Sequence, residues 1–181
     1  MHIGVIGAIE LAHPIDHGGG LLRAGCAVEE DEAGIVGEDR KVALHAAPGC
    51  AAREYFKTVA DERAHGVFLG RIAVRPEAQK TDANQLNKNL LLSPRATVDT
   101  KPELEIFADD VKCSHGATVG DLDETALFYL EARGIPPAEA RRMLIEAFAA
   151  EAIEQIEDDA VLHAHLAKHV RRWLDRDEDE A

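Results

Sequence analysis

Short runs of apolar residues, separated by turn-forming residues, occupy the middle of the chain. Gly, Asn, Asp, Ser or Pro fills most of the gaps between them. This spacing predicts strands of only three to five residues, with no room for a crossover helix between them. The runs are residues 67–69, 71–74, 90–92, 96–98, 104–107 and 111–113.

Polar residues between these runs suit the corners at which a chain turns after each strand. Closely spaced short strands are typical of a hairpin stack or sandwich and equally of a β-solenoid. No strict sequence period separates the two, so the pattern alone leaves both open. The predicted corner residues are Asn84, Asn87, Asn89, Asp99, Asp109 and Asp110.

The pattern becomes helical after residue 120. Asp121 with Glu124 three residues later resembles a capping box that opens a helix, and Gly134 predicts its end. Pro136 and Pro137 suit the first turn of a second helix. The predicted apolar side of the first helix holds Ala126, Leu127, Phe128 and Leu130. The predicted stripe of the second runs through Ala140, Met143, Leu144, Ala147 and Phe148 and on towards Ile153 and Ile156.

A third helix is predicted from Ala160, with Leu162, Leu166, Val170 and Trp173 on one side. The chain therefore divides into three parts. Residues 1–40 are rich in Gly, Ala and acids and form a poorly defined segment without clear periodicity. Residues 41–120 hold the strands, and residues 121–181 form a small C-terminal helical domain.

Composition narrows the function classes. The chain has 181 residues, 46% of them hydrophobic and 30% charged, which is enough for a packed core. A net charge of −14 argues against nucleic acid and anionic membranes as partners. No apolar run reaches membrane-spanning length, and residues 3–11 make a poor signal peptide, so a cytoplasmic protein is expected.

Three cysteines are few and widely spaced, which predicts neither a disulfide framework nor a CxxC zinc site. Cys113 and His115 are suitable ligands for iron or an iron–sulfur cluster, and on a strand they would point to the same side. Two ligands do not complete a site, so a partner would have to supply the rest. On residue types alone, a small buried Cys and a turn-bonding His are the favoured interpretation.

Two further histidines have helical spacing. His165 and His169 lie four residues apart, so one helix face would carry both, but the sequence offers no third ligand. Asp109 and Asp110 are adjacent and would face opposite sides of a strand, which disfavours a catalytic carboxylate pair.

One long segment is more specific than these short patterns. It is KPELEIFADDVKCSHGATVGDLDETALFYLEARGI, residues 101–135. HGVFLGRIAV (65–74) and AQKTDANQLNKNLLLS (78–93) precede it, and LHAAPGCAAREYFKTV (44–59) precedes them. In this order the strings resemble the core of the SufB/SufD family over roughly residues 41–156, and CSHGATVG resembles its SufD branch.

The resemblance implies a fold. Family members are longer and contain a right-handed parallel β-helix, a single-stranded solenoid, between N-terminal and C-terminal helical domains. This sequence would hold the last coils and the C-terminal helices, as a truncated β-helix. Residues 1–40 do not resemble the family; they would either cap the exposed solenoid end or leave it open for self-association.

The resemblance also implies a function. The chain would be a scaffold subunit of iron–sulfur cluster assembly without an enzyme activity of its own. It would pair with a SufB-type subunit and bind the SufC-type ATPase, and ATP hydrolysis would belong to SufC. A transient iron–sulfur cluster would form at the SufB interface, where His115 matches the histidine that faces a SufB cysteine. Cys113 is the second candidate ligand.

The C-terminal helices of the family bind SufC, which here points to Arg141, Arg142, Met143 and Phe148. Alternatively, Met143 and Phe148 pack on the preceding helix. Two rival functions remain open. One is a small metal-binding domain or metalloenzyme that uses Cys113 and His115, and the other is a truncated remnant without activity.

Overall fold

The computed structural model describes residues 26–30, 38–154 and 160–176. Their strands are β1 (Cys26–Glu30), β2 (Glu38–His45), β3 (Ala51–Ala60), β4 (His65–Val74), β5 (Asp82–Leu91), β6 (Thr97–Ile106) and β7 (Lys112–Asp121). Three helices follow these strands: α1 (Glu124–Glu131), α2 (Pro137–Ile153) and α3 (Ala160–Arg176). The described protein is therefore mainly β, with its helices at the C-terminal side.

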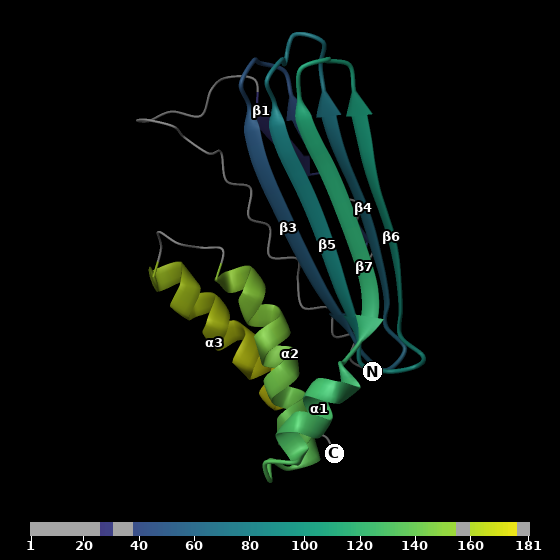
Figure 1. The fold of residues 1–181 in the computed structure, drawn as a ribbon, viewed down its shortest axis with the longest axis vertical. Helices are drawn as coiled ribbons and strands as arrows, with labels where there is room; N and C mark the ends of the chain where they lie inside the picture. Colours follow the sequence, from purple (N-terminus) through teal and green to yellow (C-terminus); the bar gives the residue numbers. More distant parts are fainter. Residues whose placement is uncertain (1–25, 31–37, 155–159, 177–181) are drawn as a thin grey trace.

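Successive strands from β2 to β7 alternate between two sheets (Figure 1). One sheet has the order β1-β2-β4-β6 and the other β3-β5-β7. Every neighbouring pair is parallel except β1–β2. The hairpin stack that the short runs also allowed is therefore wrong for β2–β7. The predicted strand length is wrong as well, because β3 to β7 are each ten residues long.

The strands pair in a regular register. Each pairs with a strand about 30 residues further on, as Ala51 pairs with Asp82 and Asp82 with Lys112. Paired residues of in-register parallel strands project from the same face of a sheet. Each inward position therefore continues as a row of side chains that crosses the strands of one sheet.

The core lies between the two sheets. Phe56 of β3 and Phe68 of β4 meet there, with ring centroids 4.7 Å apart. Small residues from both sheets pack around Ile72 and Val74, which are 0% and 1% exposed. These small and mostly aliphatic side chains agree with an aromatic content of only 4%.

Three of the predicted corner residues lie inside β5. Asn87 and Asn89 are 0% and 3% exposed, so they point into the protein instead of lying at turns. Asn89 Nδ2 donates to Asn87 Oδ1 at 2.6 Å and to the Thr118 carbonyl at 3.0 Å. These bonds satisfy part of the hydrogen-bonding capacity of the two buried amides. Asn84 is also in β5 and Asp99 in β6, whereas Asp109 and Asp110 do lie between strands.

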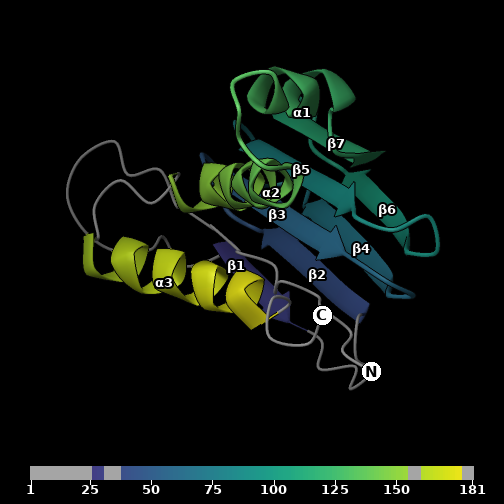
Figure 2. The same cartoon turned by 90° about the horizontal axis from the view of Figure 1, so that it is seen from below.

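The outer face of the β3-β5-β7 sheet is covered by helices (Figure 2). Val59 and Leu90 of that sheet pack with Ile145 of α2 and Val170 of α3 in one buried cluster. The buried line of α2 differs from the predicted stripe, because Met143 is 40% exposed and Ala147 is also exposed. Its buried residues are Ala140, Ile145, Ala149, Ala152 and Ile153.

A polar clamp fixes α2 to the sheet. Glu151 of α2 accepts from Lys57 of β3 and, at 2.7 Å, from Lys88 of β5. Lys57 also donates to the Phe148 carbonyl at 2.5 Å and lies 3.9 Å from the centroid of the Phe148 ring. Burial lowers the pKa of Lys57, against the opposing effect of Glu151, and the two lysines lower the pKa of Glu151 to about 2.

The first helix begins two residues later than the predicted capping box. Asp123, not Asp121, is the N-cap, and Phe128 on the predicted apolar side is 72% exposed. Gly134 follows the helix end with a φ of 85°, in the left-handed region that glycine adopts readily. The predicted start of α2 at Pro137 and of α3 at Ala160 is confirmed.

Replacing the Asp123 cap with alanine should lower stability. Its carboxylate accepts from the backbone N–H of Thr125 at 2.8 Å and of Ala126 at 3.4 Å. We expect Asp123→Ala to reduce the free energy of unfolding by about 1 kcal/mol, measured by urea denaturation. Asp121→Ala is the matched control and should change it by less than about 0.5 kcal/mol. Equal losses in both variants would contradict the assignment of the cap.

Regular pairing extends into the first forty residues. β1 pairs antiparallel with β2, from Cys26 opposite His45 to Glu30 opposite Lys41. The sequence pattern instead predicts an irregular segment here.

Cys50 is 3% exposed and disulfide-bonded, so the chain forms a disulfide that its sparse cysteines did not predict. Trp173, which was predicted on one side of the third helix, falls outside the residues whose side chains are described.

Candidate functional site

Strand β7 places both predicted ligands on one face. Cys113 pairs with Ala83 and His115 with Gln85, and these partners are buried on the inward face of β5. Cys113 is half-buried beside the small-residue core, and it is a free thiol. Burial raises its pKa, with a backbone hydrogen bond at Ala83 opposing the effect. The thiol is therefore held in its protonated form more firmly than an exposed cysteine.

His115 ends a row of polar residues that crosses the sheet. The row runs from Glu54 of β3 through Gln85 of β5 to His115 of β7. Glu54 and Gln85 are 2% and 0% exposed, and Gln85 Nε2 donates to Glu54 Oε2. His115 is exposed, because no strand follows β7 in the sheet that the described residues form.

Apolar residues surround this open end. In the other sheet, Leu104 and Ile106 of β6 are 36% and 37% exposed. Their partners one strand earlier, Ile72 and Val74, are 0% and 1% exposed. Val119 of β7 is 44% exposed. Positions that are buried one strand earlier are thus open to solvent at the last strand of each described sheet.

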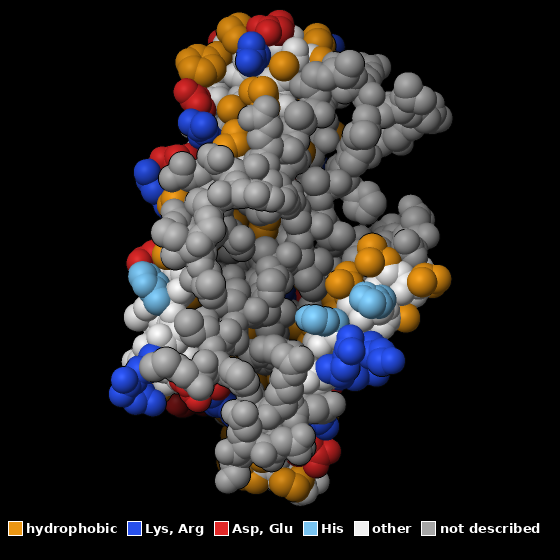
Figure 3. All heavy atoms as spheres, turned by 180° about the vertical axis from the view of Figure 1, so that it is seen from behind, with side chains coloured by type: hydrophobic (Ala, Val, Ile, Leu, Met, Phe, Trp, Pro, Cys, Tyr) orange, Lys and Arg blue, Asp and Glu red, His pale blue; other side chains and the backbone are white. Residues whose placement is uncertain are grey.

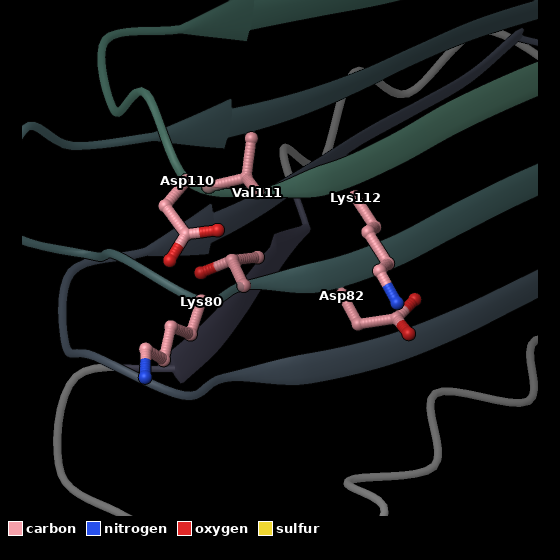
Figure 4. Close-up of a pocket in the computed structure, with 6 residues that line it drawn as sticks. Lys80, Asp82, Asp110, Val111 and Lys112 are labelled. Atoms are coloured by element: carbon pink, nitrogen blue, oxygen red, sulfur yellow. The ribbon is translucent and has the colours of Figure 1, made fainter.

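A groove of about 390 Å³ lies at the turns that lead into β5 and β7 (Figure 4). Lys80 and Asp110 come from the two turns, and Lys112 extends toward Asp82 from the neighbouring strand. Charges of both signs line the groove, so it favours neither an anion nor a cation. Its lining residue Lys112 directly precedes Cys113 in the sequence.

The residues suggested for SufC binding divide into two sets. Arg141 donates to the Leu92 carbonyl at 2.5 Å, and half-buried Phe148 packs against the cluster under α2. Arg142 lies 4.0 Å from Glu146, one turn further along the helix, and Met143 is 40% exposed. The outer surface of α2 therefore offers Arg142 and Met143, while Arg141 and Phe148 hold the helix in place.

Helix α3 carries two histidines, His165 and His169, that are both exposed. Figure 3 shows pale-blue histidine side chains beside blue Lys and Arg side chains on one face of the molecule. Within the described ranges, no three His, Cys, Asp or Glu side chains gather as a metal site. No helix in the described part of the chain combines the length and apolar character needed to cross a bilayer.

The sequence interpretation missed the two residues behind His115. Glu54 and Gln85 belong to no short motif, and each resembles an ordinary surface residue. Their positions carried a signal all the same, because they precede His115 by 61 and 30 residues, which matches the strand register. The spacing becomes informative only when the strand pairing is known, because the pairing places the three residues side by side.

The fold and the CSHGATVG strand agree with one protein family. The family model described as "SUF system FeS cluster assembly, SufBD core domain" matches residues 36–148. That is more than half of the chain, so the chain belongs to the SufBD core family.

Within this family the chain is similar to SufD proteins. It is 49% identical over 119 residues to the iron–sulfur cluster assembly protein SufD of Escherichia coli, covering 66% of this chain and 28% of that protein. It is 50% identical over 109 residues to a SufBD family protein of Synechocystis, covering 60% and 24%. Protein ABCI7 of Arabidopsis thaliana, a chloroplastic protein, is 52% identical over 109 residues, covering 60% and 23%. The chain thus spans about a quarter of the length of these relatives.

Proposed function

We propose that the chain is a scaffold component of iron–sulfur cluster assembly that presents His115 to a nascent cluster at the interface with a SufB-type subunit. The observation that carries the proposal is the exposed imidazole on the inward face of the last strand, at the open end of the sheet. A group that is to be shared with a neighbouring subunit has to be reachable from outside. The cluster is the cargo of this assembly, and the scaffold itself has no enzyme activity.

The strands form coils of a right-handed parallel β-helix. Alternation of β2–β7 between two sheets and a register of about 30 residues support this fold. Such a solenoid buries its inward rows by stacking one coil on the next. The exposure of Leu104, Ile106 and Val119 supports a partner that supplies the next layer of packing there.

Neither candidate residue completes a metal site alone. Cys113 and His115 supply one soft and one nitrogen ligand, and iron–sulfur clusters take further thiolates. A SufB cysteine provides the complement, and the cluster is held transiently. Of the two residues, His115 is the better placed because it is exposed, whereas Cys113 is half-buried with a raised pKa.

The helical part binds the SufC-type ATPase through the outer surface of α2. Arg142 and Met143 offer a charged and an apolar contact there, a combination suited to protein interfaces. A movement of SufC is transmitted from α2 to the strands through two contacts, the Arg141 hydrogen bond and the clamp at Glu151.

Copurification tests the proposal. The chain is coexpressed with SufB and SufC, isolated through a tag on the chain, and the product analysed for iron and acid-labile sulfide. We expect a complex that contains both partners and accumulates a cluster. Isolation of the chain without either partner would contradict the proposal and would favour a remnant without activity.

Self-association is the second candidate, favoured by the same exposed apolar row. Size-exclusion chromatography of the chain alone distinguishes the two. A dimer that persists when SufB is added would favour a homomeric assembly. Stoichiometric iron bound by a monomer would favour the isolated metal-binding domain instead.

A further inference from the structure

Gln85 is the buried neighbour of His115 in the row across the sheet. We propose that it is a positioning residue: once a partner covers the open end, Gln85 Oε1 accepts a hydrogen bond from a ring N–H of His115. The inference rests on the proposed function, since it concerns the state in which that end is covered. The inference gives a positioning role to Gln85 and Glu54, which are buried too deeply to touch a partner.

The orientation of the Gln85 amide follows from its partner. Its Nε2, which can only donate, bonds Glu54 Oε2, so the amide nitrogen faces Glu54. Gln85 Oε1 is then left as an acceptor, buried and without a hydrogen-bond partner. A buried acceptor without a hydrogen-bond partner costs free energy, so a hydrogen bond from a donor that reaches it is favourable.

Gly70 of β4 makes room for this oxygen. A Cβ added at Gly70 would lie only 2.3 Å from Gln85 Oε1, so a larger residue would push the amide aside. The close approach shows that Oε1 points across the interior toward the opposite sheet. His115 projects from the same face of the sheet as Gln85, one strand along.

The pairing of β5 with β7 places His115 beside Gln85. Neighbouring strands lie about 4.8 Å apart, so in-register side chains on one face are adjacent. In the described structure the imidazole is exposed at the open end, and a turn of the ring toward the interior joins it to Gln85. A partner that buries this end removes the competing water.

The hydrogen bond would set the tautomer of His115. Because Gln85 Oε1 can only accept, the imidazole nitrogen facing it must carry the proton. The other nitrogen then keeps its lone pair and faces the partner, which is the form that ligates metal. Polar groups behind a metal ligand act in this way on ring orientation and basicity.

Histidine nitrogen NMR of the complex tests the inference. The chain is labelled with ¹⁵N-histidine, assembled with unlabelled SufB and SufC, and studied by magic-angle-spinning NMR at pH 8.5. That pH lies well above the ordinary histidine pKa of about 6.5. The His115 signals are assigned by their loss in His115→Ala. We expect wild type to show one hydrogen-bonded tautomer.

Gln85→Met should change the tautomer ratio about fivefold, the factor that corresponds to a hydrogen bond of about 1 kcal/mol. Gly70→Ala should act in the same direction by displacing the amide. Asn84→Ala is the matched control, because Asn84 Nδ2 donates to Ser114 Oγ at 2.6 Å on the opposite face of the same two strands. It should leave the ratio within twofold of wild type, well below that fivefold change.

The outcomes separate the two proposals. A complex whose wild-type His115 shows no hydrogen-bonded N–H overturns the role of Gln85 without any variant, as does an unchanged ratio in Gln85→Met and Gly70→Ala. The proposed function survives both of these results. Failure of the chain to form the complex overturns the proposed function and the inference with it.

Discussion

His115→Ala is expected to abolish cluster accumulation in the proposed complex of this chain with SufB and SufC while leaving that complex intact. The imidazole is exposed on the last strand of its sheet, so its removal leaves no cavity in the core. The free energy of unfolding should change by less than about 0.5 kcal/mol, as for other surface substitutions. Iron and acid-labile sulfide per complex should fall to the background of the apo preparation.

His165→Ala is the matched control for this loss. His165 is also an exposed histidine but lies on α3, so its variant should retain the wild-type cluster content. Cys113→Ala is expected to have a smaller effect than His115→Ala, because burial raises the pKa of Cys113 and disfavours its thiolate. Wild-type cluster content in His115→Ala would remove this residue from the mechanism.

The sequence predicted the starts of α2 and α3 but placed the cap of α1 two residues too early. Pro137 begins α2 because proline has no N–H to lose in a first helical turn. The prediction failed where packing decides. Met143 and Ile145 are both apolar, and only the positions of the sheet and of α3 determine that Ile145 is buried and Met143 exposed.

The strands were harder to predict for a related reason. A strand with polar residues inside shows no apolar alternation, so Asn87 and Asn89 resembled turns although they lie within β5. The same polar interior hid the row behind His115. The shared face of Cys113 and His115 was predictable, because residues two apart point to the same side in any strand that contains both.

Glu151→Ala is expected to destabilise the docking of α2 by about 2 kcal/mol. Removing one partner of a fully buried ion pair costs about 3–5 kcal/mol. The loss here is smaller, since the Glu151 side chain is 47% exposed and Lys57 keeps the Phe148 carbonyl. Urea denaturation followed by circular dichroism measures it.

A double-mutant cycle with Lys57→Met isolates the ion pair. Lys57 is 4% exposed, so an apolar side chain of similar length fits its site, and the double variant should be more stable than Glu151→Ala alone. Glu105→Ala is the control, because Glu105 pairs with Arg71 at 3.4 Å with both side chains about half exposed. Its cost should stay below about 1 kcal/mol. Equal costs at Glu105 and Glu151 would contradict the clamp.

The same clamp predicts how stability depends on acid. The pKa of Glu151 is lowered from 4.5 to about 2 in the folded protein, chiefly by the Lys57 hydrogen bond and then by Lys88. Between these values the unfolded chain binds a proton that the folded chain does not, so stability falls as the pH drops from about 4.5 to about 2. Glu151→Gln should flatten that part of the pH profile, and Glu105→Gln should not. A Glu151→Gln profile parallel to wild type over this range would show that the carboxylate is not held by its lysines, and α2 would then depend on its apolar contacts alone.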